Sequence, residues 1–551
     1  MRRGLRPPGR RHRRRGGRAV GPGGGGPRAS ARRSGGGGVT AERRRTLVTL
    51  AGLVLVWEVV GRLGLVADGA LPSLSAIAAS LVQNWAVYPP HLAATLSAAG
   101  AGFVLGNAVA VVLALAFALV PVLQRVTSTL LVTLFCLPIV VAAPILGIAY
   151  GGDWPKIILA ALAVFFPTMI STLVGLRTVP PGAVEVVHAS GGGRLRALAL
   201  VRLRHALPDL LAGLQVAAPA AMLGALLGEF LGGRRGLGVY LLGSMGRAEP
   251  ATLWAIGLVA AGISAAAYGV LGLVRRALGA HDVQPIADPS DSGAGAAGRP
   301  AARVLLALTG VVVLLCAWYA FVGSTGLPTT VMNTPLDVWH NLVSGANAGR
   351  TREALLPALG GSLLAAAIGS LAGIAVAWLL AVALTLVPAA ARVTMPFAFL
   401  SQTMPIIALV PLIALLFGRG TLTVVVVTIS VTFFPALVTI QQGLAKAPQG
   451  QLDVLRSVDA SRWTTLRLVT IPNATPYLLA SVRLAAPRAL VGVLLAEQFV
   501  TGTGLGGLLG ASRGYLDYRM MWVITAVVAA VAVLTYAAAE GAERVVQRRR
   551  A

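Results

Sequence analysis

Phosphate and dinucleotide binding need particular residues at particular spacings, so both can be sought directly in the sequence. A phosphate-binding loop ends in Gly-Lys-Ser or Gly-Lys-Thr, whereas the two lysines of this chain, Lys156 and Lys446, follow proline and alanine. The glycines of the stretch 502–507 match a dinucleotide fingerprint, but a membrane helix rather than a strand is expected before them. We therefore predict no ATP site, no catalytic residue and no cofactor, and interpret 502–507 as a tight extracytoplasmic turn.

Metal binding is also not indicated. Cys136 and Cys316 lie in separate apolar runs, and His188 and His205 have no carboxylate and cysteine cluster near them in the sequence. We interpret both cysteines as core residues and predict no metal site.

Two carboxylates stand inside apolar segments, where an ionisable group is costly and is a functional candidate by default. Glu229 and Glu497 each lie about 20 residues, or roughly 30 Å of helix, beyond the prolines Pro208 and Pro476. Both are possible residues of a solute pathway near its outer mouth. The alternative, which we favour, is a hydrogen bond at headgroup level or between helices.

These residues recur in pairs because the chain is a tandem duplication. An offset of 268 relates Glu185–Pro208 to Asp453–Pro476, and also Glu229 to Glu497. Upstream the offset is 267, which relates Gly102 and Gly106 to Gly369 and Gly373. The spacing Gly-x-x-x-Gly lets membrane helices approach closely, so we expect an interhelical contact in each copy.

The elements that carry these residues are membrane helices. The composition, 56% hydrophobic and 12% charged, excludes an ordinary soluble globule. We predict an all-α polytopic membrane protein with about twelve transmembrane helices, six in each of two parallel repeats. The expected spans lie near 46–66, 92–120, 124–149, 156–176, 209–231, 252–274, 303–323, 357–387, 391–417, 421–442, 477–500 and 520–541.

The repeats are flanked by polar segments. Residues 1–45 hold fifteen arginines against one acid, Glu42, and are expected to be a disordered cytoplasmic tail. We interpret the tail either as a topology signal that retains the N-terminus inside or as the product of translation from an upstream start codon. A binder of nucleic acid or anionic lipid is the less favoured alternative. Residues 46–276 form the first repeat, 277–302 a cytoplasmic linker, 303–545 the second repeat and 546–551 a basic tail.

Arginine placement puts both termini and both copies of the 268-offset stretch in the cytoplasm. Arg234, Arg235 and Arg247 fall on the outer side and break this rule locally.

The duplicated stretch resembles the cytoplasmic EAA loop of the membrane subunits of binding-protein-dependent ABC importers. That motif has an acidic residue, a glycine six residues later and then two prolines four residues apart. The first copy offers Glu185, Gly191 and Pro208, with Arg204 at the earlier proline; the second offers Asp453, Asp459, Pro472 and Pro476. Outer segments around Glu229 and Glu497 are similar to permeases of the nitrate, sulfonate, taurine and thiamine-pyrimidine-precursor class.

The resemblance implies a permease that forms the pathway for a small polar solute in the plasma or inner membrane. It implies two copies of a separate ATPase subunit and an extracytoplasmic solute-binding protein as partners, and no nucleic acid. An ion-coupled secondary transporter is the alternative, and a membrane scaffold is a third.

The resemblance also implies that each loop seats a short coupling helix on an ATPase. The residues that it points to are Glu185, Gly191, Arg194, Pro208, Asp453, Asp459, Arg462, Pro472 and Pro476. Asp459 can replace glycine because aspartate tolerates left-handed backbone better than most residues. We also expect its carboxylate to cap the helix that begins near Arg462.

Overall fold

The computed structural model describes residues 51–52, 54–278, 300–387 and 405–548, together with positions 390, 391, 394, 395 and 398. The predicted tail 1–45 lies outside these residues, as do most of the predicted linker and most of the first half of the predicted span 391–417. Within the described residues all regular structure is helical, which agrees with the predicted all-α class.

The first repeat consists of a helical stretch at 54–62 and a series of longer and shorter helices. In chain order they are η1 (Ala67–Gly69), α2 (Leu74–Gln83), α3 (Tyr88–Leu119), α4 (Pro121–Cys136), α5 (Ile139–Ala149), α6 (Trp154–Arg177), α7 (Pro181–Ala189), α8 (Arg194–Ala197), the π-helical turn η2 (Leu198–Arg202), α9 (Leu203–Gly232), α10 (Leu237–Gly246) and α11 (Pro250–Ala277).

The second repeat follows the same order with small differences. Its helices are α12 (Pro300–Ser324), α13 (Pro335–Trp339), the π-helical turn η3 (His340–Ser344), α14 (Ala348–Leu386), α16 (Ile406–Phe417), α17 (Thr421–Ala445), α18 (Gln449–Ser457), α19 (Arg462–Thr465), the π-helical turns η4 (Leu466–Thr470) and η5 (Glu497–Thr501) on either side of α20 (Ile471–Ala496), α21 (Gly504–Gly514) and α22 (Tyr518–Arg548).

Eight helices among the described residues are long and apolar enough to cross a membrane, and a bent pair makes up to nine. The bent pair falls on the predicted span 124–149, where α4 and α5 meet at an angle of 99°. The cause is Pro138: a residue before proline avoids helical backbone, and Leu137 is extended with φ −64° and ψ 116°.

Close helix crossings hold each repeat together, as the Gly-x-x-x-Gly spacing predicts. A Cβ on Gly102 would lie 2.4 Å from the Ala160 side chain, so α3 approaches α6 where only glycine fits. In the second repeat a Cβ on Gly369 would lie 2.5 Å from Thr428 Cβ of α17. The predicted interhelical contact is therefore confirmed in both copies.

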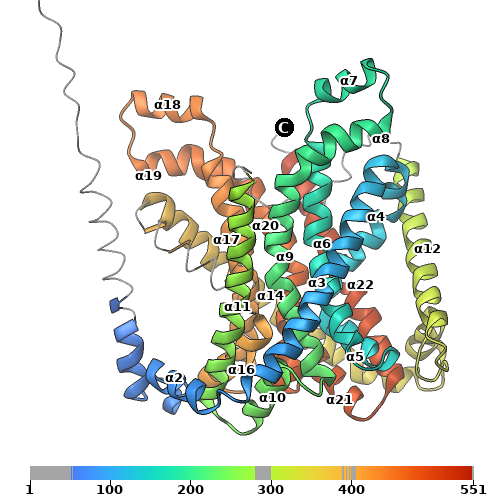
Figure 1. Ribbon diagram of the computed structural model, residues 1–551, viewed down its shortest axis with the longest axis vertical. Coiled ribbons are helices and arrows are strands. Elements are labelled where there is room, and N and C mark those ends of the chain that lie inside the picture. The colour runs from blue at the N-terminus through green and yellow to red at the C-terminus, as the bar shows by residue number, and fades with distance from the viewer. Residues whose placement is uncertain are drawn as a thin grey trace, which may run out of the picture. The chain divides into compact units, whose positions relative to one another are not determined.

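The two repeats also pack against each other. The short helices that follow Pro138 and Pro405 each contact the other repeat. Helix α5 packs on α20 and α22, and α16 packs on α9 and α11. The Thr525 hydroxyl of α22 donates to the Val141 carbonyl of α5 over 3.2 Å. Figure 1 shows α7 with α8 and α18 with α19 projecting at one end of this part of the chain.

Candidate coupling loops and translocation pathway

The duplicated loops have the same backbone. Helices α7 and α18, α8 and α19, and η2 and η4 begin and end at residues related by the offset of 268. In the turn between them Gly191 N donates to the His188 carbonyl over 3.0 Å, and Asp459 N donates to the Arg456 carbonyl over 3.1 Å. Sequence differences between the loops therefore leave their main-chain structure unchanged.

The predicted left-handed position is confirmed in both loops. Gly191 has φ +75° and Asp459 has φ +50°. Such backbone is open to glycine and, among other residues, best tolerated by asparagine and aspartate. The glycine of the first loop and the aspartate of the second thus satisfy one conformational requirement.

The predicted capping role of Asp459 is wrong. The residue that caps α19 is Ser461, whose side chain accepts from the Thr464 N–H over 3.1 Å. Ser461 is extended, with φ −60° and ψ 157°, as an N-cap must be, whereas Asp459 sits two residues earlier in the turn.

Neither α7 nor α18 buries a single residue within the chain. Glu185, Arg194, Asp453 and Arg462 are all exposed. Apolar side chains are exposed at matched positions of both loops as well: Val186 and Val454, Leu195 and Trp463, and Leu200 and Leu468. Exposed apolar surface of this kind is typical of regions that contact another protein or the membrane.

The remaining predicted loop residues stand where the loops re-enter the apolar helices. Pro208 lies in the second turn of α9, and Pro472 and Pro476 lie in the first two turns of α20. Arg462 reaches back toward α14, with its Nη1 3.4 Å from the Leu386 carbonyl.

Glu229 and Glu497 are buried, 1% and 3% exposed, at the opposite end of α9 and α20. Glu229 Oε2 accepts from the Gly238 N–H over 2.9 Å and from the Thr95 hydroxyl over 3.0 Å. Glu497 Oε2 accepts from the Gly506 N–H over 3.0 Å. The favoured alternative of the sequence analysis, an interhelical hydrogen bond, is present at both sites.

Each carboxylate caps a short helix that the sequence did not predict. The Thr95 hydroxyl accepts from Leu237 N at the start of α10 over 2.8 Å. Its counterpart Ser362 accepts from Leu505 N at the start of α21 over 2.8 Å and donates to Glu497. A carboxylate is favoured at a helix N-terminus because the unpaired N–H groups there carry positive partial charge.

The repeated Gly-Leu-Gly stretches are what let the chain close over these carboxylates. A Cβ on Gly236, at φ +140°, would lie 2.0 Å from the Glu229 carboxyl carbon, and one on Gly504, at φ +64°, would lie 2.1 Å from Glu497 Oε1. The predicted turn at 502–507 is present at Gly502, whose backbone is left-handed, but α21 already begins at Gly504.

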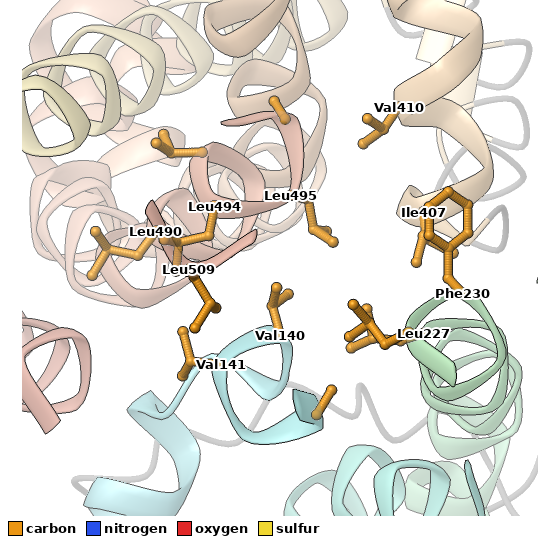
Figure 2. Packing of buried hydrophobic residues seen from close by; sticks show 14 of the residues in the cluster. Val140, Val141, Leu227, Phe230, Ile407, Val410, Leu490, Leu494, Leu495 and Leu509 are labelled. Carbon is orange, nitrogen blue, oxygen red and sulfur yellow. The ribbon is translucent and has the colours of Figure 1, made fainter. Parts of the chain in front are cut away.

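A central apolar cluster contains residues from both repeats and includes the start of the capped helices α10 and α21. Its repeat-related members include Val140 with Ile407 and Leu227 with Leu495. Figure 2 shows Val140 below Leu495 and facing Leu227, and Ile407 beside Phe230. No sequence signal singled out these residues, since leucine and valine also face lipid in a membrane helix.

Comparison with known proteins gives the family. The family described as "Binding-protein-dependent transport system inner membrane component" matches residues 72–279 and again 369–551. The chain belongs to this family. It is an integral membrane permease of the ABC importer type, and the duplication found in the sequence is two permease domains fused in tandem.

Individual permeases match about one repeat of the chain. The riboflavin transport permease RibX of Chloroflexus aurantiacus is 34% identical over 242 residues, which are 43% of this chain and 87% of the relative. The formylaminopyrimidine transport permease ThiX of Halalkalibacterium halodurans is 28% identical over 190 residues, 34% of this chain and 76% of the relative. The taurine transport permease TauC of Escherichia coli is 27% identical over 198 residues, 34% of this chain and 72% of the relative.

Proposed function

We propose that the chain by itself forms the complete membrane pathway of an importer, with two parallel six-helix repeats and both termini in the cytoplasm. In this arrangement residues 46–276 and 303–545 are the two permease domains, joined by the linker 277–302. A solute-binding protein delivers a small polar solute from outside. Two separate ATPase subunits, one on each of the duplicated loops, supply the energy.

The observation that carries the proposal is the pair of matched loops. Each presents a short helix, α7 or α18, in which no residue is fully buried, and each loop carries exposed apolar side chains at related positions. Two identical partners need two identical docking surfaces, and the backbone of the loops meets that need. Glu185, Gly191 and Arg194 in one loop, and Asp453, Asp459 and Arg462 in the other, are the proposed contact residues.

The central apolar cluster supports a pathway that is closed in this structure. Residues from α5, α9, α16 and α20 meet there, so opening it requires the two repeats to move apart. An ion-coupled mechanism is less well supported, because Glu229 and Glu497 are both engaged in capping helices.

The test is ATP hydrolysis in lipid vesicles that contain the permease, its ATPase and the loaded binding protein. Glu185→Lys and Asp453→Lys are each expected to reduce the stimulated hydrolysis about tenfold, the effect of losing ~1.4 kcal/mol at each docking surface. The permease without the ATPase should hydrolyse no ATP.

Glu353→Lys is the matched control, because Glu353 is exposed in α14 and lies outside both loops. It should leave the stimulated hydrolysis unchanged. Wild-type stimulation in both charge-reversal variants would remove the loops from the mechanism, and hydrolysis by the permease alone would refute a separate energy source.

A further inference from the structure

A cavity of about 1150 Å³ opens at the end of α9 remote from the coupling loop. Its walls come from both repeats. The first repeat contributes α5, the loop before α6, and the end of α9 with the segment that follows it; the second contributes the end of α21, the start of α22 and Leu516 between them. We call it the outer cavity. It is of the size that holds a small solute.

The outer cavity ends on the central apolar cluster. Ala143 of α5 and Leu231 of α9 line the cavity and are also members of that cluster. A solute in the cavity therefore stands directly above the closed part of the proposed pathway.

Positive charge dominates the lining. Lys156, Arg234, Arg235 and Arg513 line the cavity, against one acid, Asp153. Asp153 already pairs with the Lys156 ammonium over 2.5 Å, and that lysine side chain is only 6% exposed. The Arg513 guanidinium donates to the Leu231 carbonyl, which holds it at the cavity wall.

The nearby acid Asp517 is not one of the lining residues. It follows the lining residue Leu516, but its Oδ1 accepts from the Met520 N–H over 3.1 Å at the start of α22. The cavity thus has three guanidinium groups with no carboxylate partner among its lining residues.

This charge is absent from the duplicated pattern. The repeat positions that correspond to Arg234, Arg235 and Arg513 hold Gly502, Thr503 and Met245. Arg234 and Arg235 also break the rule that places arginine on the cytoplasmic side. Neither the repeat pattern nor the topology rule accounts for Arg234 and Arg235, and Arg513, which is tied to the Leu231 carbonyl, lies with them in the cavity lining.

We propose that the outer cavity receives a small anion, a solute that carries a sulfonate, carboxylate or phosphate group. This inference rests on the proposed function, because it names the solute class for that pathway. Guanidinium groups pair with such oxyanions through two parallel hydrogen bonds, and a recessed site of one sign raises the local concentration of the opposite ion. An acidic side chain of the binding protein has the same chemistry and is the competing source.

The test uses charged thiol reagents on the full chain in lipid nanodiscs. The background carries Cys136→Ala and Cys316→Ser, which remove the two natural thiols. Leu516→Cys places a thiol in the cavity lining, and Ala248→Cys places one at the repeat-related position outside it. The two positions are matched, with φ +57° at Leu516 and +51° at Ala248.

The measured quantity is the rate of modification by an ethylsulfonate methanethiosulfonate divided by the rate with its trimethylammonium analogue. We expect this ratio to be about tenfold higher in the Leu516→Cys chain than in the Ala248→Cys chain, the lower end of what a focused field produces. Adding Arg234→Gln and Arg235→Gln should bring it close to the control value, whereas Arg234→Lys and Arg235→Lys should preserve it. Equal ratios at the two positions, or a ratio that the Gln variants do not lower, would overturn the proposal.

Protection then identifies the source of the anion. Free ethanesulfonate should slow modification of the Leu516→Cys chain, whereas ethanol should not. Protection by the solute-free binding protein but not by ethanesulfonate would assign the arginines to protein docking and overturn the solute proposal. None of these readouts involves ATP hydrolysis, so their failure is distinct from failure of the coupling loops.

Discussion

The two repeats agree at the duplicated loops, which are the proposed coupling loops, and differ at the opposite ends of α9 and α20, the proposed outer ends. In the loops, every helix boundary is repeated at the same offset, even though glycine in one copy is aspartate in the other. At the outer ends, α9 continues as a regular helix to Gly232, whereas α20 ends at Ala496 and passes into the π-helical turn η5. Backbone shape has been kept at one end of the molecule and has diverged at the other.

This difference has a physical explanation under the proposed function. Two copies of one ATPase impose the same surface on both loops, so substitutions there are limited to those that keep the backbone. A single solute and a single binding protein impose no such symmetry outside. The outer ends can therefore differ in sequence, as they do where Arg234 and Arg235 of one copy correspond to Gly502 and Thr503 of the other.

The largest effect is expected where the outer ends differ in how they hold the capped helices. In the first repeat, His91 Nδ1 lies 2.7 Å from the Gly236 carbonyl and gives the α10 cap a second tie. The second repeat has Ala358 at that position, so α21 depends more on Glu497. We expect Glu497→Ala to lower the free energy of unfolding by about 3 kcal/mol and Glu229→Ala by about 2 kcal/mol, because each removes a charged hydrogen-bond acceptor from buried N–H groups.

Denaturant unfolding of the purified permease in detergent, followed by circular dichroism, measures both values. His91→Ala is the discriminating control, since in its presence the effect of Glu229→Ala should rise to that of Glu497→Ala. Equal losses in the two single variants would show that the outer ends are energetically equivalent despite their different contacts.

Much of this fold could be predicted from the sequence because each structural signal occurs in both copies of the duplicated chain. The helical class, the Gly-x-x-x-Gly contacts and the left-handed position at Gly191 and Asp459 each follow from residue types at repeated positions. The break at Pro138 was also accessible, since the residue before a proline avoids helical backbone. The predominantly apolar stretch 130–149 concealed it.

Other features could not be predicted, for a reason particular to membranes. Apolar residues face both lipid and the protein interior, so Val140 and Leu227 of the central cluster carry no mark that separates them from lipid-facing neighbours. The caps were hidden differently: Thr95 and Ser362 are ordinary hydroxyl residues, and their partners lie 134 and 135 residues away.

A smaller effect is expected in the loops, where the comparison concerns one backbone position. Asp459→Gly and Gly191→Asp should both be nearly neutral, because each copies the other loop. Gly191→Val and Asp459→Val should each cost about 1–2 kcal/mol locally, because a β-branched residue is strained at positive φ. Limited proteolysis of the loops in the purified permease reads this strain as faster cleavage. Slower or unchanged cleavage in both valine variants would mean that the left-handed turn is not required.

The smallest effect is expected for the one ion pair within the second coupling helix. Asp453 Oδ1 and Arg456 Nη1 are 3.0 Å apart, with side chains 66% and 70% exposed. The first loop has Glu185 and His188 at these positions, and the His188 ring contacts the Gly192 carbonyl instead. Exposed pairs of this kind contribute less than about 0.5 kcal/mol, and salt screens them.

Arg456→Ala should therefore leave denaturant unfolding of the permease unchanged within that limit, at low and at high salt, while Asp453→Lys still impairs stimulated ATP hydrolysis. If Arg456→Ala instead lowers stability by more than about 1 kcal/mol, the acid serves its own helix, and the two loops differ in what their acidic residues do.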